Sequence, residues 1–317
     1  MVTSPPLRIA CFGTPEFAVP TLQKLIDSRH DVVAVVSQPD RPKGRGQKEQ
    51  PTPTKVTAEA AGIAVLQPVR IRDDEFLRAV RAMSLDLGVV AAYGKILPDD
   101  LLAIPRLGMI NVHASLLPEY RGAAPVHRAV IDGRTETGVT IMRVVRELDA
   151  GPMFARVTRP IGRDDTSLEV EQALAATGGD LLLEVVERLA ANTATEEPQD
   201  HGRASYAHKL TKAEGTIDWA LSAGRIHNLV RGLQPWPLVS THLGDRRFLL
   251  HRTGRTGDRS EAVPGTIVEA TGDRLHVVAG DGEVLRILQL QPEGRRVMTA
   301  REFLAGRAVQ AGDLFRP

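Results

Sequence analysis

Hydrophobic and polar positions follow two periods along the first 190 residues. Short, mostly apolar runs bounded by turn-forming residues predict buried strands over residues 7–13, 31–37, 86–94, 109–115 and 137–145. Between them, apolar positions recur every three to four residues, which predicts helices over residues 14–28, 54–62, 73–83, the residues after Ala124, and 165–189. This alternation predicts an α/β fold, with a Rossmann-like, mostly parallel sheet and helices on both faces.

The pattern changes after residue 190. Residues 191–205 are polar and acidic and contain a proline, which predicts a linker. Beyond it, a short helix over residues 221–233 is followed by brief strands over 265–270, 274–280 and 283–291, with Gly-Asp turns between them. We therefore predict an N-terminal domain over residues 1–190, a linker over 191–205 and a small β-barrel domain over 206–317.

Composition narrows the class of protein. Of the 317 residues, 42% are hydrophobic and 25% are charged, which is ordinary for a globular protein with two cores. The sequence has neither a bilayer-length apolar run nor the features of a signal peptide, so we expect a cytoplasmic protein without membrane contact. Cys11 is the only cysteine and is expected in the core, and no cluster has metal-ligand spacing, so we expect no metal.

The distribution of charge bears on the partner of the protein, and the spacing of its glycines bears on its cofactor. The net charge is +1, with a small acidic excess in residues 1–200 and a small basic excess in residues 201–317. The basic half is compatible with a polyanion partner, and equally with a mixed-charge solvated surface. The turn after the first strand, Phe12-Gly13-Thr14-Pro15, lacks the second and third glycines of a dinucleotide fingerprint. We therefore do not expect a nicotinamide cofactor.

Residues 109–125 (MINVHASLLPEYRGAAP) concentrate the candidate chemistry. Asn111 and His113 lie two residues apart on a predicted strand, so their side chains project from the same face. The carboxyl end of a buried strand is where open α/β sheets place their sites. An amide and an imidazole can stabilise an oxyanion, and a carboxylate near the imidazole would orient it. Asp149 is the candidate carboxylate, because it follows the strand over 137–145 and so lies at a strand's carboxyl end.

This segment and several others resemble the folate-dependent formyltransferases. The other segments follow the family's order: FGTPEFA (12–18), SQPDRPKGRGQK (37–48), AYGKILP (92–98), GVTIM (138–142), LDAGPM (148–153), YAHKLTKAEGTIDW (206–219) and PWP (235–237). The resemblance implies a catalytic domain over residues 1–190. It also implies a tRNA-binding barrel over residues 206–317, similar to an oligonucleotide-binding fold.

The resemblance further implies a reaction and its residues. The formyl group of 10-formyltetrahydrofolate would pass to the amino group of methionine on initiator tRNA, by direct attack through a tetrahedral intermediate. Asn111 would hold the formyl oxygen, and His113 would stabilise the intermediate and act as acid and base. Asp149 would orient His113 and help to take the amine proton. The implied folate contacts are Ser115, Leu116, Leu117 and Pro118.

The loop over residues 37–50 is the predicted tRNA contact. It contains several cations, two prolines and two glycines, which predicts an exposed, mobile segment that can bind a phosphate backbone. The resemblance implies that Arg45 contacts the acceptor arm of the tRNA, with further contacts from Lys43, Lys48 and Lys209.

Other functions stay open at this stage. Glycinamide ribonucleotide formyltransferases, sugar-nucleotide formyltransferases and formyltetrahydrofolate deformylases share the N-terminal chemistry. The basic loop and the segment over 206–219 favour the tRNA enzyme. A tRNA-binding module with an inactive core is disfavoured by the intact Asn111, His113 and Asp149. Oligomeric state cannot be inferred from the sequence, and a monomer is the default expectation.

Overall fold

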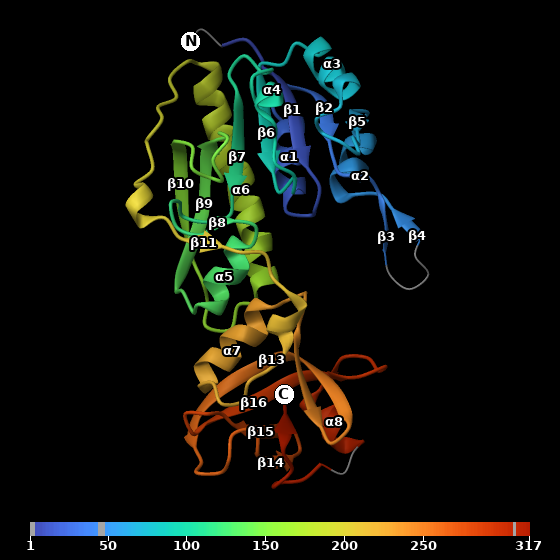
Figure 1. Ribbon diagram of the computed structural model, residues 1–317, viewed down its shortest axis with the longest axis vertical. Coiled ribbons are helices and arrows are strands. Elements are labelled where there is room, and N and C mark those ends of the chain that lie inside the picture. Colours follow the sequence, from blue (N-terminus) through green and yellow to red (C-terminus); the bar gives the residue numbers. More distant parts are fainter. Residues whose placement is uncertain (1–3, 44–47, 307–308) are drawn as a thin grey trace. The chain divides into compact units, whose positions relative to one another are not determined.

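The computed structural model describes residues 4–43, 48–306 and 309–317 of the chain. These residues form two compact units (Figure 1). The first unit comprises Met1–Pro125, Thr137–Arg159 and Glu171–Ala207, and the second comprises Val126–Glu136, Pro160–Val170 and His208–Pro317. Two short segments of the N-terminal half thus belong to the second unit, and residues 191–205 belong to the first.

A seven-stranded sheet forms the centre of the first unit, in the order β10-β9-β7-β6-β1-β2-β5 (Figure 1). Its strands are β1 (Arg8–Gly13), β2 (Asp31–Val36), β5 (Ala64–Leu66), β6 (Leu87–Ala91), β7 (Met109–His113), β9 (Glu136–Arg143) and β10 (Met153–Pro160). The pairs β1–β2, β1–β6, β2–β5 and β6–β7 are parallel, whereas β7–β9 is antiparallel. The predicted Rossmann-like, mostly parallel sheet is confirmed.

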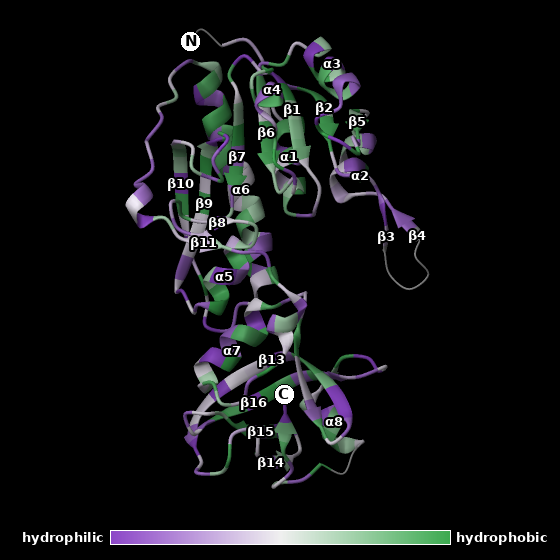
Figure 2. Cartoon of the chain, in the orientation of Figure 1, coloured by the Kyte–Doolittle hydropathy of each residue, from purple (hydrophilic) through white to green (hydrophobic). Residues whose placement is uncertain are grey.

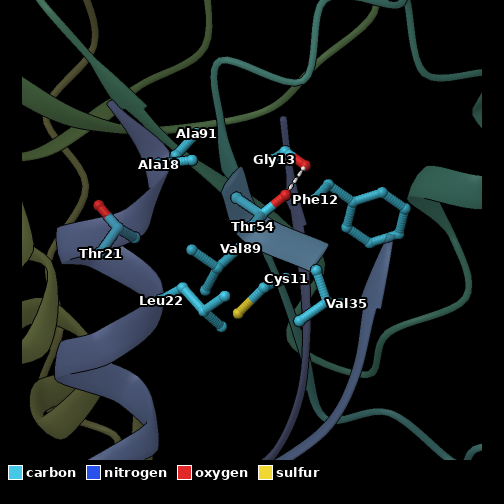
Figure 3. A pocket seen from close by; sticks show the side chains of 10 residues that line it. All are labelled: Cys11, Phe12, Gly13, Ala18, Thr21, Leu22, Val35, Thr54, Val89 and Ala91. Atoms are coloured by element: carbon cyan, nitrogen blue, oxygen red, sulfur yellow. Dashed lines mark hydrogen bonds between the residues drawn. The ribbon is translucent and has the colours of Figure 1, made fainter. Parts of the chain in front are cut away.

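Helices cover both faces of this sheet, as predicted. They are α1 (Ala18–Ile26), α2 (Pro53–Ala60), α3 (Asp74–Ala82), α4 (Asp99–Leu102) and α6 (Ser167–Ala190). Successive residues of β1 point to opposite faces. Phe12 packs in one core cluster with Leu77 of α3 and Leu101 of α4. Cys11 faces the other side, where it lies near Leu22 of α1 (Figure 3).

Tight packing between β1 and α1 explains the glycine at the end of the first strand. A Cβ atom on Gly13 would lie 2.7 Å from Cβ of Ala18, so only glycine allows this close approach. The hydroxyl of Thr54 donates a hydrogen bond of 2.9 Å to the Gly13 carbonyl (Figure 3). The cavity beside them is only about 10 Å³, and burial raises the pKa of Cys11 to about 12. Cys11 is therefore an uncharged core residue, as expected.

Two adjacent glycines let α6 pack closely within the first unit. A Cβ atom on Gly178 would lie 2.9 Å from Cγ1 of Val112 in β7, and one on Gly179 would lie 3.1 Å from the Pro20 carbonyl oxygen in α1. The helix is continuous over Ser167–Ala190. The predicted helix is thus confirmed, and the two glycines serve its close packing.

The second unit contains a curled antiparallel half-barrel. Its sheet has the order β14-β15-β16-β13-β12-β18, with β17 paired to β16. Its elements are α5 (Pro125–Ile131, mostly in this unit), α7 (Ala223–Gly232), β12 (Val239–Leu243), β13 (Arg246–Arg259), β14 (Ile267–Thr271), β15 (Arg274–Val278), β16 (Glu283–Pro292), β17 (Met298–Thr299), α8 (Ala300–Ala305) and β18 (Phe315–Arg316). An antiparallel bridge between Thr266 and Leu314 brings the two outer strands together. The prediction of a small C-terminal β domain is confirmed.

Aromatic side chains fill the core of the second unit. Trp219 stacks on Phe315 with ring centroids 5.9 Å apart, and Phe248 meets Phe303 edge to face at 5.5 Å. Trp219 and Phe248 are buried, whereas Trp236 is 51% exposed and is not part of this core.

Hydropathy follows this architecture: the central strands β1 and β6 are largely hydrophobic, whereas helices such as α3 carry both hydrophobic and hydrophilic residues (Figure 2). No helix within the described ranges is long and apolar enough to cross a membrane.

Candidate active site

The amide and imidazole of the candidate site come from β7. Val112 points toward α6, since its Cγ1 atom borders Gly178. Asn111 and His113 therefore project from the opposite face of the strand. His113 is buried, whereas Asn111 is partly exposed. In the described part of the chain, the side-chain amide of Asn111 has no hydrogen-bond partner, so both of its N–H groups are available to a ligand.

The imidazole of His113 is held from two sides. Its Nε2 atom lies 3.0 Å from the carbonyl oxygen of Tyr120, and its Nδ1 atom lies 3.7 Å from Oδ2 of Asp149. A carbonyl oxygen only accepts, so Nε2 carries a hydrogen and donates it to Tyr120. The neutral ring is thereby fixed as the tautomer whose Nδ1 atom is free to receive a proton beside the carboxylate.

Asp149 reaches His113 by a route that the sequence pattern does not predict. Because β9 is antiparallel to β7, Arg143 at the end of β9 lies beside Ile110, whereas His113 lies beside Thr140. The carboxyl ends of these two strands therefore do not share an edge of the sheet. The loop after β9 must return along the sheet to bring its carboxylate to the imidazole. The expected proximity is confirmed, but the reason expected for it is wrong.

Backbone groups fix the Asp149 carboxylate. Oδ2 accepts a hydrogen bond of 2.8 Å from the backbone N–H of Gly122, which lies in β8 (Arg121–Gly122). Asp149 has a left-handed backbone with φ of 47°, and two residues later a Cβ atom on Gly151 would lie 2.0 Å from the Arg143 carbonyl oxygen. The loop is thus tightly constrained. The backbone groups that hold the pair, the Gly122 N–H on Asp149 and the Tyr120 carbonyl on His113, cannot be predicted from the sequence because backbone groups leave no side-chain signal.

The segment after β7, residues 115–118, forms a turn that internal hydrogen bonds hold in place. The hydroxyl of Ser115 donates to the Glu119 carbonyl at 2.6 Å, and the backbone carbonyl of Ser115 accepts from the Thr140 hydroxyl at 2.7 Å. Leu117 is buried in a small cluster with Met142 and Met153, and Pro118 is buried as well, whereas Leu116 keeps some exposure. Contact of Ser115, Leu116, Leu117 and Pro118 with folate stays a prediction.

The predicted tRNA contacts belong to two parts of the chain. Arg45 lies outside the described residues. Lys43 and Lys48 pair through their backbones in the two-stranded hairpin β3 (Arg41–Lys43) and β4 (Lys48–Gln50). Lys209 is exposed in the second unit.

The base of the β3–β4 hairpin is anchored by an ion pair. The ammonium of Lys55 donates to Oδ2 of Asp40 at 2.6 Å, and Gln67 donates to Oδ1 at 2.7 Å. The hydrogen bonds from Lys55 and Gln67 lower the pKa of Asp40 below its usual value. The Asp40 carboxylate is therefore paired with residues outside the hairpin and is not available to pair with the cations of the loop over residues 37–50.

Within the described ranges, no group of three or more His, Cys, Asp or Glu side chains is placed to hold a metal ion. The chemistry available at the site is hydrogen bonding to an oxygen by an amide and proton transfer by an imidazole with a carboxylate beside it.

Comparison with known proteins defines the class. Residues 7–186 match the family described as formyl transferase, and residues 209–308 match the formyl transferase C-terminal domain. Together with the fold and the site, these matches define a formyl transferase with both of the family's domains.

Full-length relatives narrow the class. The chain is 44% identical over 308 residues to the methionyl-tRNA formyltransferase of Geotalea uraniireducens (strain Rf4), covering 97% of each chain. It is 41% identical over 307 residues to that of Bacillus velezensis (strain DSM 23117 / BGSC 10A6 / LMG 26770 / FZB42), again covering 97% of each. The chain belongs to the methionyl-tRNA formyltransferase family.

Solved structures support the fold at lower identity. The N-formyltransferase from Helicobacter canadensis, in complex with folinic acid and dTDP-3-aminofucose, matches 89% of this chain and 98% of its own with a TM-score of 0.68 and 17% identity. HypX from Aquifex aeolicus, in complex with tetrahydrofolic acid, matches 94% of this chain and 47% of its own with a TM-score of 0.65 and 15% identity. At such identities the likeness concerns the fold alone.

Proposed function

We propose that this chain transfers the formyl group of 10-formyltetrahydrofolate to the amino group of methionine carried by initiator tRNA. The observation that carries the proposal is the placement of Asn111 and His113 on one face of β7 beside Asp149. These residues occur in a chain that is 44% identical to a methionyl-tRNA formyltransferase over 97% of its length.

Asn111 is the proposed ligand of the formyl oxygen. Its amide has no internal partner in the described part of the chain, so its N–H groups can donate to an oxygen that gains negative charge as the amine attacks. A donor held ready for such an oxygen typically contributes about 100- to 1000-fold to kcat.

His113 and Asp149 are the proposed proton carriers. Because the Tyr120 carbonyl accepts from Nε2, a proton from the attacking amine is received at Nδ1, with the Asp149 carboxylate 3.7 Å away to stabilise the charge. His113 then returns the proton to the nitrogen that leaves. One C–N bond forms to the methionine amine and one breaks to the folate, so the transfer balances.

The folate donor supplies the activated formyl group, and the segment Ser115, Leu116, Leu117 and Pro118 is its proposed wall. The Ser115 hydroxyl donates to Glu119 within the turn, its carbonyl accepts from Thr140 of β9, and Leu117 is packed into the core. The segment is therefore rigid and mostly apolar, as walls of small-molecule sites are. Leu116 is the partly exposed side chain of the segment and the first candidate for direct contact.

Initiator methionyl-tRNA is the proposed partner. Arg45 is proposed to contact its acceptor arm, with further contacts from Lys43 and Lys48 and, in the second unit, from Lys209. The anchoring of Asp40 by Lys55 supports this, because the loop's positive charges are not cancelled by that carboxylate. We propose that the protein acts as a monomer in the cytoplasm.

A sugar-nucleotide or glycinamide ribonucleotide formyltransferase is the alternative. Solved structures of such enzymes from Helicobacter canadensis and Symbiobacterium toebii are only 17% and 19% identical to this chain. The methionyl-tRNA formyltransferases are 41% to 46% identical along nearly the whole length, which favours the tRNA substrate.

An acceptor comparison tests the proposal. The purified protein receives 10-formyltetrahydrofolate with methionylated initiator tRNA, with glycinamide ribonucleotide, with an amino sugar nucleotide, or with buffer alone. Formylation of the charged tRNA alone is the expected result. Transfer to a small acceptor, or formyl release into buffer at a similar rate, would overturn the tRNA assignment.

A further inference from the structure

Gln199 lies in the segment that the sequence suggests is a linker, yet it is buried in the first unit. An antiparallel bridge between Met153 and Glu197 ties this segment to β10. The side-chain amide of Gln199 donates to the carbonyl oxygens of Asp149 at 2.9 Å and Gly151 at 2.7 Å. One buried amide thus holds the backbone of the loop that carries the candidate carboxylate.

The other end of the same amide is held by an arginine. Oε1 of Gln199 accepts from Nη2 of Arg121 at 2.7 Å and from Nε at 3.2 Å. Arginine only donates and carbonyl oxygens only accept, so the amide can have one orientation alone. A carboxylate of the same size satisfies the arginine and repels the carbonyls, and a leucine satisfies neither.

These contacts close a ring around Asp149. Its carboxylate accepts from the N–H of Gly122, and its carbonyl accepts from Gln199, which in turn binds Arg121, the neighbour of Gly122 in β8. The two residues that anchor the ring, Arg121 and Gly122, therefore both belong to the short strand β8. The ring fixes the left-handed backbone of Asp149 and, through it, the 3.7 Å separation from His113.

We propose that Gln199 is a positioning residue, which acts on the reaction by setting the Asp149 carboxylate against His113. The inference rests on the proposed catalytic role of Asp149. Placement matters at this scale, because a shift of about 1 Å in a reacting group can cost about 100-fold in rate.

Three single variants measure the effect with full-length protein. Gln199→Leu removes both halves of the contact, and Gln199→Glu keeps an acceptor for Arg121 but removes the donors to the loop. Glu197→Gln is the matched control, since its side chain lies on the surface of the same segment beside Arg156. We expect both Gln199 variants to lose about 10- to 100-fold in kcat, with KM for either substrate changed less than about threefold. The control keeps wild-type rates.

A double variant separates positioning from a general structural role. If Gln199 acts through the carboxylate, then Asp149→Ala with Gln199→Leu has the same kcat as Asp149→Ala alone, within about threefold. The inference would be overturned, with the proposed function left intact, by either of two results. One is a loss of kcat in the double variant equal to the product of the two single losses, and the other is wild-type kcat in Gln199→Glu. Wild-type kcat in Asp149→Ala would overturn the catalytic assignment itself. Thermal midpoints of all variants show which of them fold, and Gln199→Glu carries the test if the leucine variant does not.

Discussion

The backbone N–H of Gly122 donates a hydrogen bond of 2.8 Å to Oδ2 of Asp149, the same oxygen that lies 3.7 Å from His113. One carboxylate oxygen thus faces both a fixed backbone donor and a titratable imidazole. The arrangement anchors the carboxylate beside the imidazole to the main chain of a short strand, β8, and a backbone donor has no rotamers of its own. Activity should therefore depend on the geometry of the Asp149 loop as much as on the carboxylate.

Gly151→Ala tests that dependence. A Cβ atom would lie 2.0 Å from the Arg143 carbonyl oxygen, so the loop must move to accept it. We expect kcat to fall at least about 10-fold, because the carboxylate moves with the loop. Gly254→Ala is the control, since the nearest atom to its Cβ is 3.7 Å away. Equal kcat values for the two variants would show that the loop tolerates the displacement.

Asn111→Ala should lower kcat and spare binding. Loss of the free amide removes a donor to the developing oxyanion, which typically costs about 100- to 1000-fold in kcat. Steady-state kinetics with each substrate varied in turn would separate kcat from KM. A rise in KM with unchanged kcat would assign Asn111 to binding in the ground state.

Arg45→Ala should weaken use of the tRNA far more than use of the folate. Removal of one phosphate contact lowers the salt dependence of tRNA binding by about one unit of slope. Arg41→Ala is the matched control, because Arg41 is an exposed cation of the same sequence segment, residues 37–50, and donates to Gln38. Filter binding of the charged tRNA at several salt concentrations measures the slope. Identical slopes for both variants would mean that overall charge, and not Arg45, determines binding.

Glu169 makes stability depend on pH in the second unit. Hydrogen bonds from the backbone and hydroxyl of Thr166, with a further one from Arg252, lower its pKa to about 2. A carboxyl group whose pKa is lowered in the folded state stabilises the fold at any pH above its ordinary pKa. This stabilisation is lost as the pH falls from about 4.5 toward 2. Because the side chain is 43% exposed, we expect about 1 kcal/mol or less at neutral pH.

The measurement is urea unfolding of Glu169→Gln at pH 6.5 and at about pH 3.5. The variant should be less stable than the wild type at pH 6.5, and the difference should shrink at the lower pH. Asp245→Asn is the control, since Asp245 is exposed and has no ion-pair partner in the described part of the chain. A difference that grows on acidification would contradict the sign of this linkage.

The sequence predicts the fold class well because apolar periodicity is a local signal. The strand β1 is a short continuous apolar run buried on both faces, whereas the helix α3 buries one face, and both patterns can be recognised from the sequence alone. The antiparallel direction of β9 is not local, since it depends on which neighbour the strand meets. For the same reason the close packing of Gly178 against β7 and of Gly179 against α1 cannot be predicted from the sequence.

The candidate site could be predicted only as far as side chains reveal it. Asn111, His113 and Asp149 stand out by residue type and position, and the structure brings His113 and Asp149 together. The groups that hold them are the Tyr120 carbonyl, the Gly122 amide and a glutamine in a polar segment. Backbone atoms have no signature in a sequence, and a buried glutamine in a segment of polar composition looks like part of a linker.

The role of His113 is measured by the single-turnover rate of formyl transfer to methionylated initiator tRNA by His113→Ala, with the tRNA affinity of the variant measured in parallel. We expect a loss of about 100- to 10,000-fold in the rate, because proton transfer at Nδ1 is removed, and a tRNA Kd within about threefold of the wild type. A near-normal rate would remove His113 from the mechanism and contradict the proposed role of its pairing with Asp149.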